Sequence, residues 1–235
     1  MRHEIIQRPD FGMLTVVFEQ SGEQVIAEAS AMVGHDSDVT MKTGMQGGLG
    51  GALKRAALGR ESLFQNTFTS TAAGQRLQIA PPTEGDIVHV ALTPQTGTLY
   101  IQSSCYLANT PGVTLDAGWG GAKGFFSGTG VFLLKASGEG DLWISSYGAV
   151  HTIDVGTPGT AAAQGYTVDT GYIMAFSEGT DYSVTRVGGL KSLLLSGEGL
   201  VARFGGVGRV YLTSRNPAAL ASFIYPYRPV KQETN

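Results

Sequence analysis

The chain has 235 residues, 34 of them glycine, with 15% charged residues and a formal net charge of −3. A hydrophobic fraction of 42% excludes a disordered chain, and no apolar run reaches the ~18 residues of a membrane-spanning helix. A general nucleic-acid binder usually carries a basic excess, so the net charge argues against that class.

The first predicted strands belong to a pattern that recurs along the chain. Residues 25–41 (VIAEASAMVGHDSDVTM) align without a gap with residues 99–115 (LYIQSSCYLANTPGVTL). Residues 166–175 (YTVDTGYIMA) align with the same element further along. Apolar and β-branched residues bounded by turn residues predict strands in all three copies.

The first copy alone carries an insertion, residues 44–59 (GMQGGLGGALKRAALG). Within it, residues 52–58 predict a turn or two of helix. Lys54 and Arg55, together with Arg60 just after the insertion, make the densest basic spot in the chain. Function is often placed in such loops. We therefore take these three residues as a candidate interaction site for a ligand or partner. A contact between subunits and a plain surface loop are the alternatives.

A second element follows in each copy and ends in alternating apolar residues. Residues 127–145 and 196–213 each contain two G-x-G turns, and residues 63–79 are a degraded version. The fold predicted is all-β, with three tandem copies of a short double-stranded β-helix or β-sandwich unit. One compact domain, 1–235, would comprise repeats 4–80 (with the insertion 44–59), 81–154 and 155–225, followed by a tail, 226–235.

The known signatures of catalytic and cofactor sites are missing. The glycine turns match neither a dinucleotide fingerprint nor a phosphate loop, and no G-x-S-x-G is present. The four histidines, His3, His35, His89 and His151, are too far apart in sequence for H-x-H or H-E-x-x-H. We therefore predict no catalytic residue, no cofactor and no metal.

Individual candidates have simple structural interpretations. The cluster His35-Asp36-Ser37-Asp38 resembles metal ligands, but Asp and Ser are ordinary turn residues. His89 and His151 each interrupt an apolar strand and are expected as satisfied histidines in the core or on a sheet face. Glu139 and Glu198 are expected in turns. Trp119 and Trp143 are expected as core or interface aromatics.

Cys105 is the single cysteine, so no intrachain disulfide is possible, and it is expected as a packed core thiol. A lone cysteine fits a reducing compartment. The first residues, MRHEIIQRPDFG, show no export or organelle signal. These features together lead us to expect a cytoplasmic protein.

Several blocks resemble the altered-inheritance-of-mitochondria 24 family over about residues 4–225. They are PDFGMLTVVF, GGLGGALKRAALGRESLFQNTF, SYGAVHTIDV with YTVDTGYIMAF, and RVGGLKSLLLSGEGLVARFGGVGRVYLTSR. The resemblance implies a triplicated short double-stranded β-helix, similar to the tryptophan RNA-binding attenuation protein, and homotrimers in which nine repeats form a ring. It also implies, for a mitochondrial branch, a link to inner-membrane organisation and respiratory-complex assembly. It supplies no catalytic residues.

The function expected is therefore a non-enzymatic, oligomeric β-scaffold or binding protein, a homotrimer with a possible protein partner. It could aid the assembly or stability of a larger, membrane-associated complex. One alternative is a small-molecule-binding or enzymatic β-helix protein whose pocket is lined by Cys105, Tyr106 or Trp143. An RNA-binding ring is less favoured, and no nucleic acid is expected. Peripheral membrane contact through 44–59 or through residues 223–229 (FIYPYRP) is a further alternative, although that tail is better explained as a strap on a neighbouring subunit.

Overall fold

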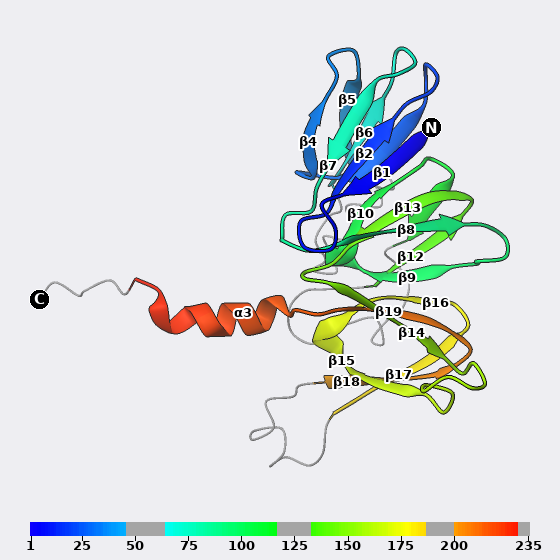
Figure 1. The fold of residues 1–235 in the computed structure, drawn as a ribbon, viewed down its shortest axis with the longest axis vertical. Helices are drawn as coiled ribbons and strands as arrows, with labels where there is room; N and C mark the ends of the chain where they lie inside the picture. The colour runs from blue at the N-terminus through cyan, green and yellow to red at the C-terminus, as the bar shows by residue number, and fades with distance from the viewer. Residues whose placement is uncertain (46–63, 117–132, 187–199, 230–235) are drawn as a thin grey trace, which may run out of the picture.

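The computed structural model describes residues 1–45, 64–116, 133–186 and 200–229, and its strands form four antiparallel sheets (Figure 1). The expectation of an all-β chain is confirmed, because the described residues contain one short α-helix beside nineteen strands. The sheets lie one above another along the long axis of the molecule.

Neighbouring strands within each sheet are often far apart in the chain, as their spatial order shows. The first sheet is β1 (Arg2–Ile6), β2 (Met13–Val17), β7 (Arg76–Ile79) and β4 (Met32–His35). The second is β5 (Thr40–Met45), β6 (Phe64–Thr69), β3 (Gln24–Glu28), β10 (Tyr106–Asn109), β13 (Gly140–Ser145) and β8 (Ile87–Leu92). The third is β11 (Val113–Asp116), β12 (Leu133–Gly138), β9 (Leu99–Gln102), β16 (Ile173–Ser177), β19 (Gly208–Thr213) and β14 (Val150–Val155). The fourth is β15 (Tyr166–Asp169), β18 (Leu200–Gly206) and β17 (Thr180–Arg186). Two 3-10 turns, η1 (Ser103–Cys105) and η3 (Thr170–Tyr172), lead into β10 and β16.

A hydrophobic core fills each space between neighbouring sheets. Side chains alternate between the two faces of a strand, so a strand that lies between two cores contributes to both. On β13, Trp143 packs in the core against the first sheet, whereas Leu142 and Ile144 pack in the core against the third. Strands β10 and β16, which lie between two cores, are therefore buried on both faces and show runs of buried residues instead of an alternation.

The two six-stranded sheets join segments that are far apart in the sequence. In the second sheet β3 pairs with β10, where Ala27 lies opposite Ala108. In the third, β16 pairs with β9, where Ala175 lies opposite Ile101. The first pairing joins β5, β6 and β3 to β10, β13 and β8, and the second joins β11, β12 and β9 to β16, β19 and β14.

The loops that precede β2, β8 and β14 meet along one side of the stack. Phe11 and Gly148 each form a parallel bridge with Gly85, and the Gly12 amide donates a 2.7 Å hydrogen bond to the Gly85 carbonyl oxygen. A Cβ added to Gly85 would lie 2.0 Å from the carbonyl oxygen of Ser146. Only glycine permits this approach of one loop to another.

An ion pair fixes the same junction. Arg8 donates from Nε to Asp86 Oδ1 at 2.7 Å and from Nη2 to Asp86 Oδ2 at 2.9 Å. The Asp86 side chain is only 6% exposed, whereas that of Arg8 is 51% exposed. The buried carboxylate also accepts a 2.8 Å hydrogen bond from the Ile87 amide, which begins β8.

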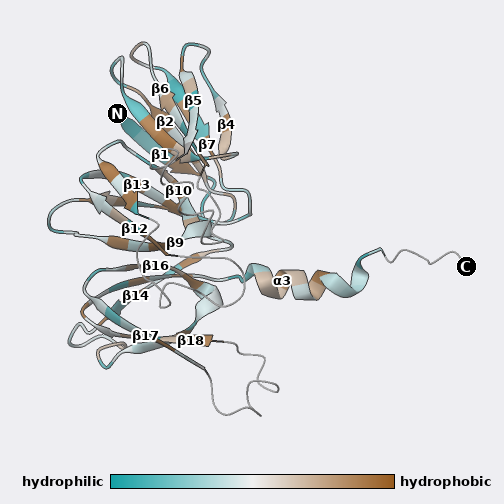
Figure 2. Cartoon of the chain, turned by 180° about the vertical axis from the view of Figure 1, so that it is seen from behind, coloured by the Kyte–Doolittle hydropathy of each residue, from teal (hydrophilic) through white to brown (hydrophobic). Residues whose placement is uncertain are grey.

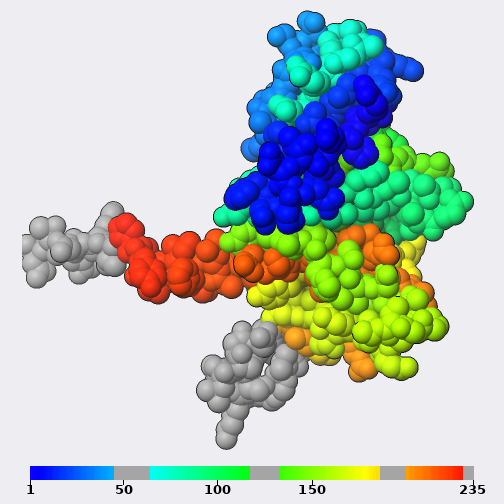
Figure 3. Space-filling view, in the orientation of Figure 1, coloured from blue at the N-terminus to red at the C-terminus, as the bar shows by residue number. Residues whose placement is uncertain are grey.

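The chain then leaves the stack as helix α3 (Pro217–Ile224), followed by the 3-10 turn η4 (Tyr225–Tyr227). The side chain of Asn216 accepts from the Ala218 amide at 2.9 Å, and Pro217 occupies the first turn, which is a favourable helix start. Figure 1 and the space-filling view in Figure 3 show α3 standing clear of the sheets. No residue of α3 is buried, and Figure 2 shows apolar residues along it. No helix among the described residues is both long and apolar enough to cross a membrane.

Candidate functional site

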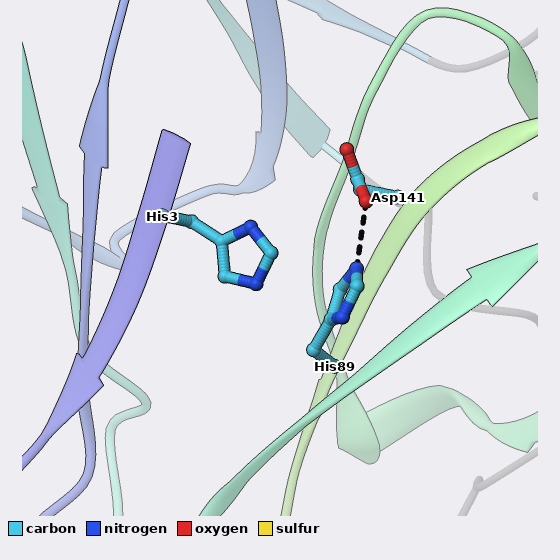
Figure 4. Close-up of side chains that lie close together, drawn as sticks. All are labelled: His3, His89 and Asp141. Carbon is cyan, nitrogen blue, oxygen red and sulfur yellow. Dashed lines mark hydrogen bonds and ion pairs between the residues drawn. The ribbon is translucent and has the colours of Figure 1, made fainter. Parts of the chain in front are cut away.

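Three titratable side chains come together where β1 passes over β8 and β13 (Figure 4). His3 comes from β1, His89 from β8 and Asp141 from β13. His89 Nε2 lies 2.7 Å from Asp141 Oδ1. One ligand atom from each residue lies within 4.8 Å of those of the other two.

Strand register places these residues on one face. His89 lies directly opposite Trp143 in the β8–β13 pair, and Asp141 is two residues from Trp143, so it projects to the same side. The Trp143 ring lies beside both imidazoles, with centroids 5.2 Å from His3 and 5.7 Å from His89. Because Trp143 is fully buried, it forms the apolar floor of the cluster.

The surroundings favour the neutral form of His3. Burial lowers the pKa of His3, as does its neighbour His89, whereas Asp141 acts in the opposite direction. The side chains of His89 and Asp141 are 27% and 34% exposed, so the cluster remains open to solvent. Two imidazoles and a carboxylate at this spacing are groups that can exchange protons or coordinate a metal ion.

A sequence profile of the mitochondrial biogenesis AIM24 family matches residues 3–215. The chain belongs to this family. The resemblance inferred from the sequence blocks is thereby confirmed. All three side chains of the cluster fall within the matched residues.

Two relatives of this AIM24-family chain come from Streptococcus pyogenes. An uncharacterised protein of serotype M6 is 28% identical over 237 residues, which cover 97% of this chain and 92% of the relative. The crystal structure of a second protein from the same species is 27% identical, with a TM-score of 0.77 over 97% of this chain and 99% of that one. The likeness therefore extends over nearly the whole length of this chain and of each relative.

The basic residues singled out in the sequence of the AIM24-family chain, Lys54, Arg55 and Arg60, lie outside the described residues. The same holds for Trp119 and Glu198. They remain predictions.

The other candidates fall where their structural interpretations placed them. Asp36 lies in the turn between β4 and β5, where its carboxylate accepts from the Arg76 amide at 2.8 Å and from the Arg76 guanidinium at 3.2 and 3.3 Å. Glu139 lies in the turn between β12 and β13, and His151 is exposed on β14. Cys105 is buried, and burial raises the pKa of its thiol to about 12. An unreactive core thiol is thus what the structure shows.

The cluster of His3, His89 and Asp141 was missed by sequence reasoning. His89 was expected as a satisfied histidine on a sheet face, and its hydrogen bond to Asp141 agrees with that. Sequence motifs for metal ligands require histidines close together in the chain, whereas the fold brings His3, His89 and Asp141 together from three separate strands. The sequence held one signal for this site: Asp141 and Trp143 are two residues apart in a predicted strand, so their side chains lie on the same face.

A second polar group of the AIM24-family chain lies at the junction of β3 and β10. Burial raises the pKa of Glu28 to about 7, and its charge acts on both Cys105 and Tyr106. The Tyr106 hydroxyl accepts from Gln65 Nε2 at 3.0 Å and donates to Asn109 Oδ1 at 2.7 Å. These two hydrogen bonds satisfy the Tyr106 hydroxyl inside the core.

Glu28→Gln should make stability less dependent on pH. Because the pKa of Glu28 is raised in the folded protein, folding favours the protonated carboxyl, and wild-type stability falls as pH rises from about 4.5 to about 7. We expect the variant to gain about 1–2 kcal/mol over wild type at pH 8, after allowing for partial exposure, and little at pH 4.5. Urea unfolding at both pH values measures this. The exposed Glu4→Gln is the control, and an equal gain at both pH values would contradict the expectation.

Proposed function

We propose that this AIM24-family protein is a non-enzymatic β-scaffold that assembles as a homotrimer and presents a binding surface to a protein partner. The observation that carries the proposal is the projecting apolar arm formed by α3 and η4. Along this arm the exposed fractions are 68% for Phe223, 61% for Tyr225 and 76% for Tyr227. Large aromatic side chains exposed together mark an interaction surface.

The arm needs a partner surface to be stable. Its eight-residue helix is shorter than the ~12–15 residues at which isolated helices become stable in water. No residue of the helix is buried among the described residues, so further apolar contacts would have to come from another molecule. A second copy of the same chain is the occupant we propose.

The stack offers a place for that arm. A groove of about 420 Å³ lies at the base of α3, and Phe11, which is 70% exposed, lines it together with Tyr147 and Arg215. If the arm of one copy enters this groove on the next, the contact is head-to-tail. Head-to-tail contacts close into a ring when the rotation between copies permits.

Strand order supports three tandem units within each copy. The order β2–β7–β4 is repeated as β8–β13–β10 and as β14–β19–β16, and the order β3–β6–β5 as β9–β12–β11 and β15–β18–β17. In this proposal each unit has six strands, and β14 belongs to the third unit because it pairs with β19. The sequence alignment had assigned residues 150–154 to the second repeat.

Light scattering coupled to size-exclusion chromatography tests the trimer. The wild type should have a mass near three times 24.6 kDa. The triple variant Phe223→Ser, Tyr225→Ser, Tyr227→Ser should be monomeric yet folded, because these side chains are largely exposed in the single chain. A control, Val33→Ser with Met41→Ser, removes exposed apolar side chains from β4 and β5 and should leave the mass unchanged.

Two outcomes would contradict this proposal. A monomeric wild type would remove the need for a partner copy, and a small-molecule-binding function would then move ahead. A trimer that survives in the triple variant would place the interface elsewhere. Circular dichroism of the variant shows in either case whether the fold is intact.

A further inference from the structure

We propose that His3, His89 and Asp141 form a binding site for one divalent transition-metal ion, of which Zn²⁺ is the best match. The inference is independent of the trimer. It rests on the cluster seen in Figure 4, where side chains from three strands converge on one point.

The ligand types select the class of metal. Imidazole nitrogens suit Zn²⁺ and its neighbours in the transition series, and one carboxylate oxygen completes a common three-ligand set. Ca²⁺ and Mg²⁺ prefer sites built from oxygen alone, so two histidines disfavour them. The set leaves one position of a tetrahedral ion for water or another ligand.

The geometry needs only small side-chain adjustments. At metal–ligand bond lengths of about 2.0–2.1 Å, neighbouring tetrahedral ligand atoms lie roughly 3.3 Å apart. The His89–Asp141 pair, now 2.7 Å apart, would open slightly, and no pair of ligand atoms exceeds 4.8 Å. His3 lies on β1, an edge strand of the first sheet, so its side chain has room to close the gap.

The surroundings suit a bound ion. Trp143 closes the inner side, whereas the partly exposed His89 and Asp141 leave a path from solvent. The indole Nε1 of Trp143 is a buried donor that has no partner among the described atoms, and its ring adjoins both imidazoles.

Metal binding replaces an existing hydrogen bond. In the metal-free protein, His89 Nε2 lies 2.7 Å from Asp141 Oδ1, and when both atoms coordinate the ion the neutral imidazole carries its proton on Nδ1 instead.

Isothermal titration calorimetry with Zn²⁺ on the EDTA-treated, tag-free full chain tests the site. We expect one ion per chain, micromolar or tighter affinity, and a rise of several degrees in Tm when Zn²⁺ is in excess. The variants His3→Ala, His89→Ala and Asp141→Asn should each weaken binding at least ~10-fold. The matched controls His35→Ala and His151→Ala should bind as wild type does.

Co²⁺ supplies a second readout that does not depend on stability. Intense visible absorption of a tetrahedral Co²⁺ complex should appear with the wild type and the two controls and vanish with the three cluster variants. Cu²⁺ and Ni²⁺ are avoided as probes, because both bind readily to backbone nitrogens beside a histidine. Circular dichroism checks that His3→Ala is folded. The loss of one side chain from the edge strand β1 should leave the cores intact.

Some results would overturn the proposal. Zn²⁺ that fails to bind at 100 µM, or binding that persists unchanged in all three cluster variants, would mean that these residues hold no metal. Binding lost equally in His35→Ala or His151→Ala would point to non-specific histidine coordination.

Discussion

Gly85→Ala should lower the free energy of unfolding by about 3 kcal/mol or more. The added Cβ would lie 2.0 Å from the Ser146 carbonyl oxygen and 2.9 Å from the backbone of Gly148. These neighbours are backbone atoms, so no rotamer change can relieve the overlap. The loops themselves must separate, which also weakens the hydrogen bond from the Gly12 amide to the Gly85 carbonyl.

Urea unfolding compares this variant with Gly34→Ala. An added Cβ at Gly34, in β4, would meet nothing within 4 Å, so its substitution should change stability by less than ~1 kcal/mol. The Gly85 variant should also lose about 6–12 °C in Tm, if each kcal/mol corresponds to 2–4 °C in a chain of this size. Equal effects at the two positions would show that the loop contact does not constrain the stack.

Arg8→Met should cost about 3 kcal/mol, whereas Arg76→Met should cost less than ~1 kcal/mol. Both arginines form two hydrogen bonds to one aspartate, but the carboxylates differ in burial: the Asp86 side chain is 6% exposed and the Asp36 side chain 37%. Loss of Arg8 leaves the charge of Asp86 buried and without its partner. Loss of Arg76 leaves the charge of Asp36 in water.

A double variant separates charge from shape at this junction. In Arg8→Met combined with Asp86→Asn the buried charge is gone, while an amide oxygen remains to accept from the Ile87 amide. We expect this pair to recover at least half of the stability lost in Arg8→Met, measured by urea unfolding at pH 7. If Arg8→Met and Arg76→Met lose equal stability, burial of the carboxylate does not set the energy of the pair.

The strands with alternating apolar residues and the glycine turns were predictable from the sequence. Leu77 and Ile79, Leu142 and Ile144, and Val210 and Leu212 recur every second residue, and they lie on β7, β13 and β19. Period 2 reports a strand directly. Strands such as β10 carry apolar residues on both faces, as in the run Tyr106 to Ala108, so the pattern cannot say which core each side chain enters.

Other features depend on tertiary structure and left weak signals. Helix α3 begins at the Asn216-Pro217 pair, and its apolar sequence, PAALASFI, is typical of a buried helix, whereas none of its residues is buried. The site of His3, His89 and Asp141 requires the passage of β1 over the β8–β13 pair, and no local spacing encodes it. The register of β8 and β13 puts His89 opposite Trp143, and this pairing is known only once the sheet is known.

The pairing of β3 with β10 affects the chain while it is being made. On the ribosome β3 emerges long before residues 106–109, so one edge of its growing sheet stays open during much of synthesis. The face of the second sheet that packs on β9, β12 and β16 is likewise uncovered until those strands follow. Open strand edges and bare apolar surfaces are the features of folding intermediates that aggregate. The nascent chain is thus expected to need protection by a chaperone until β16 has emerged.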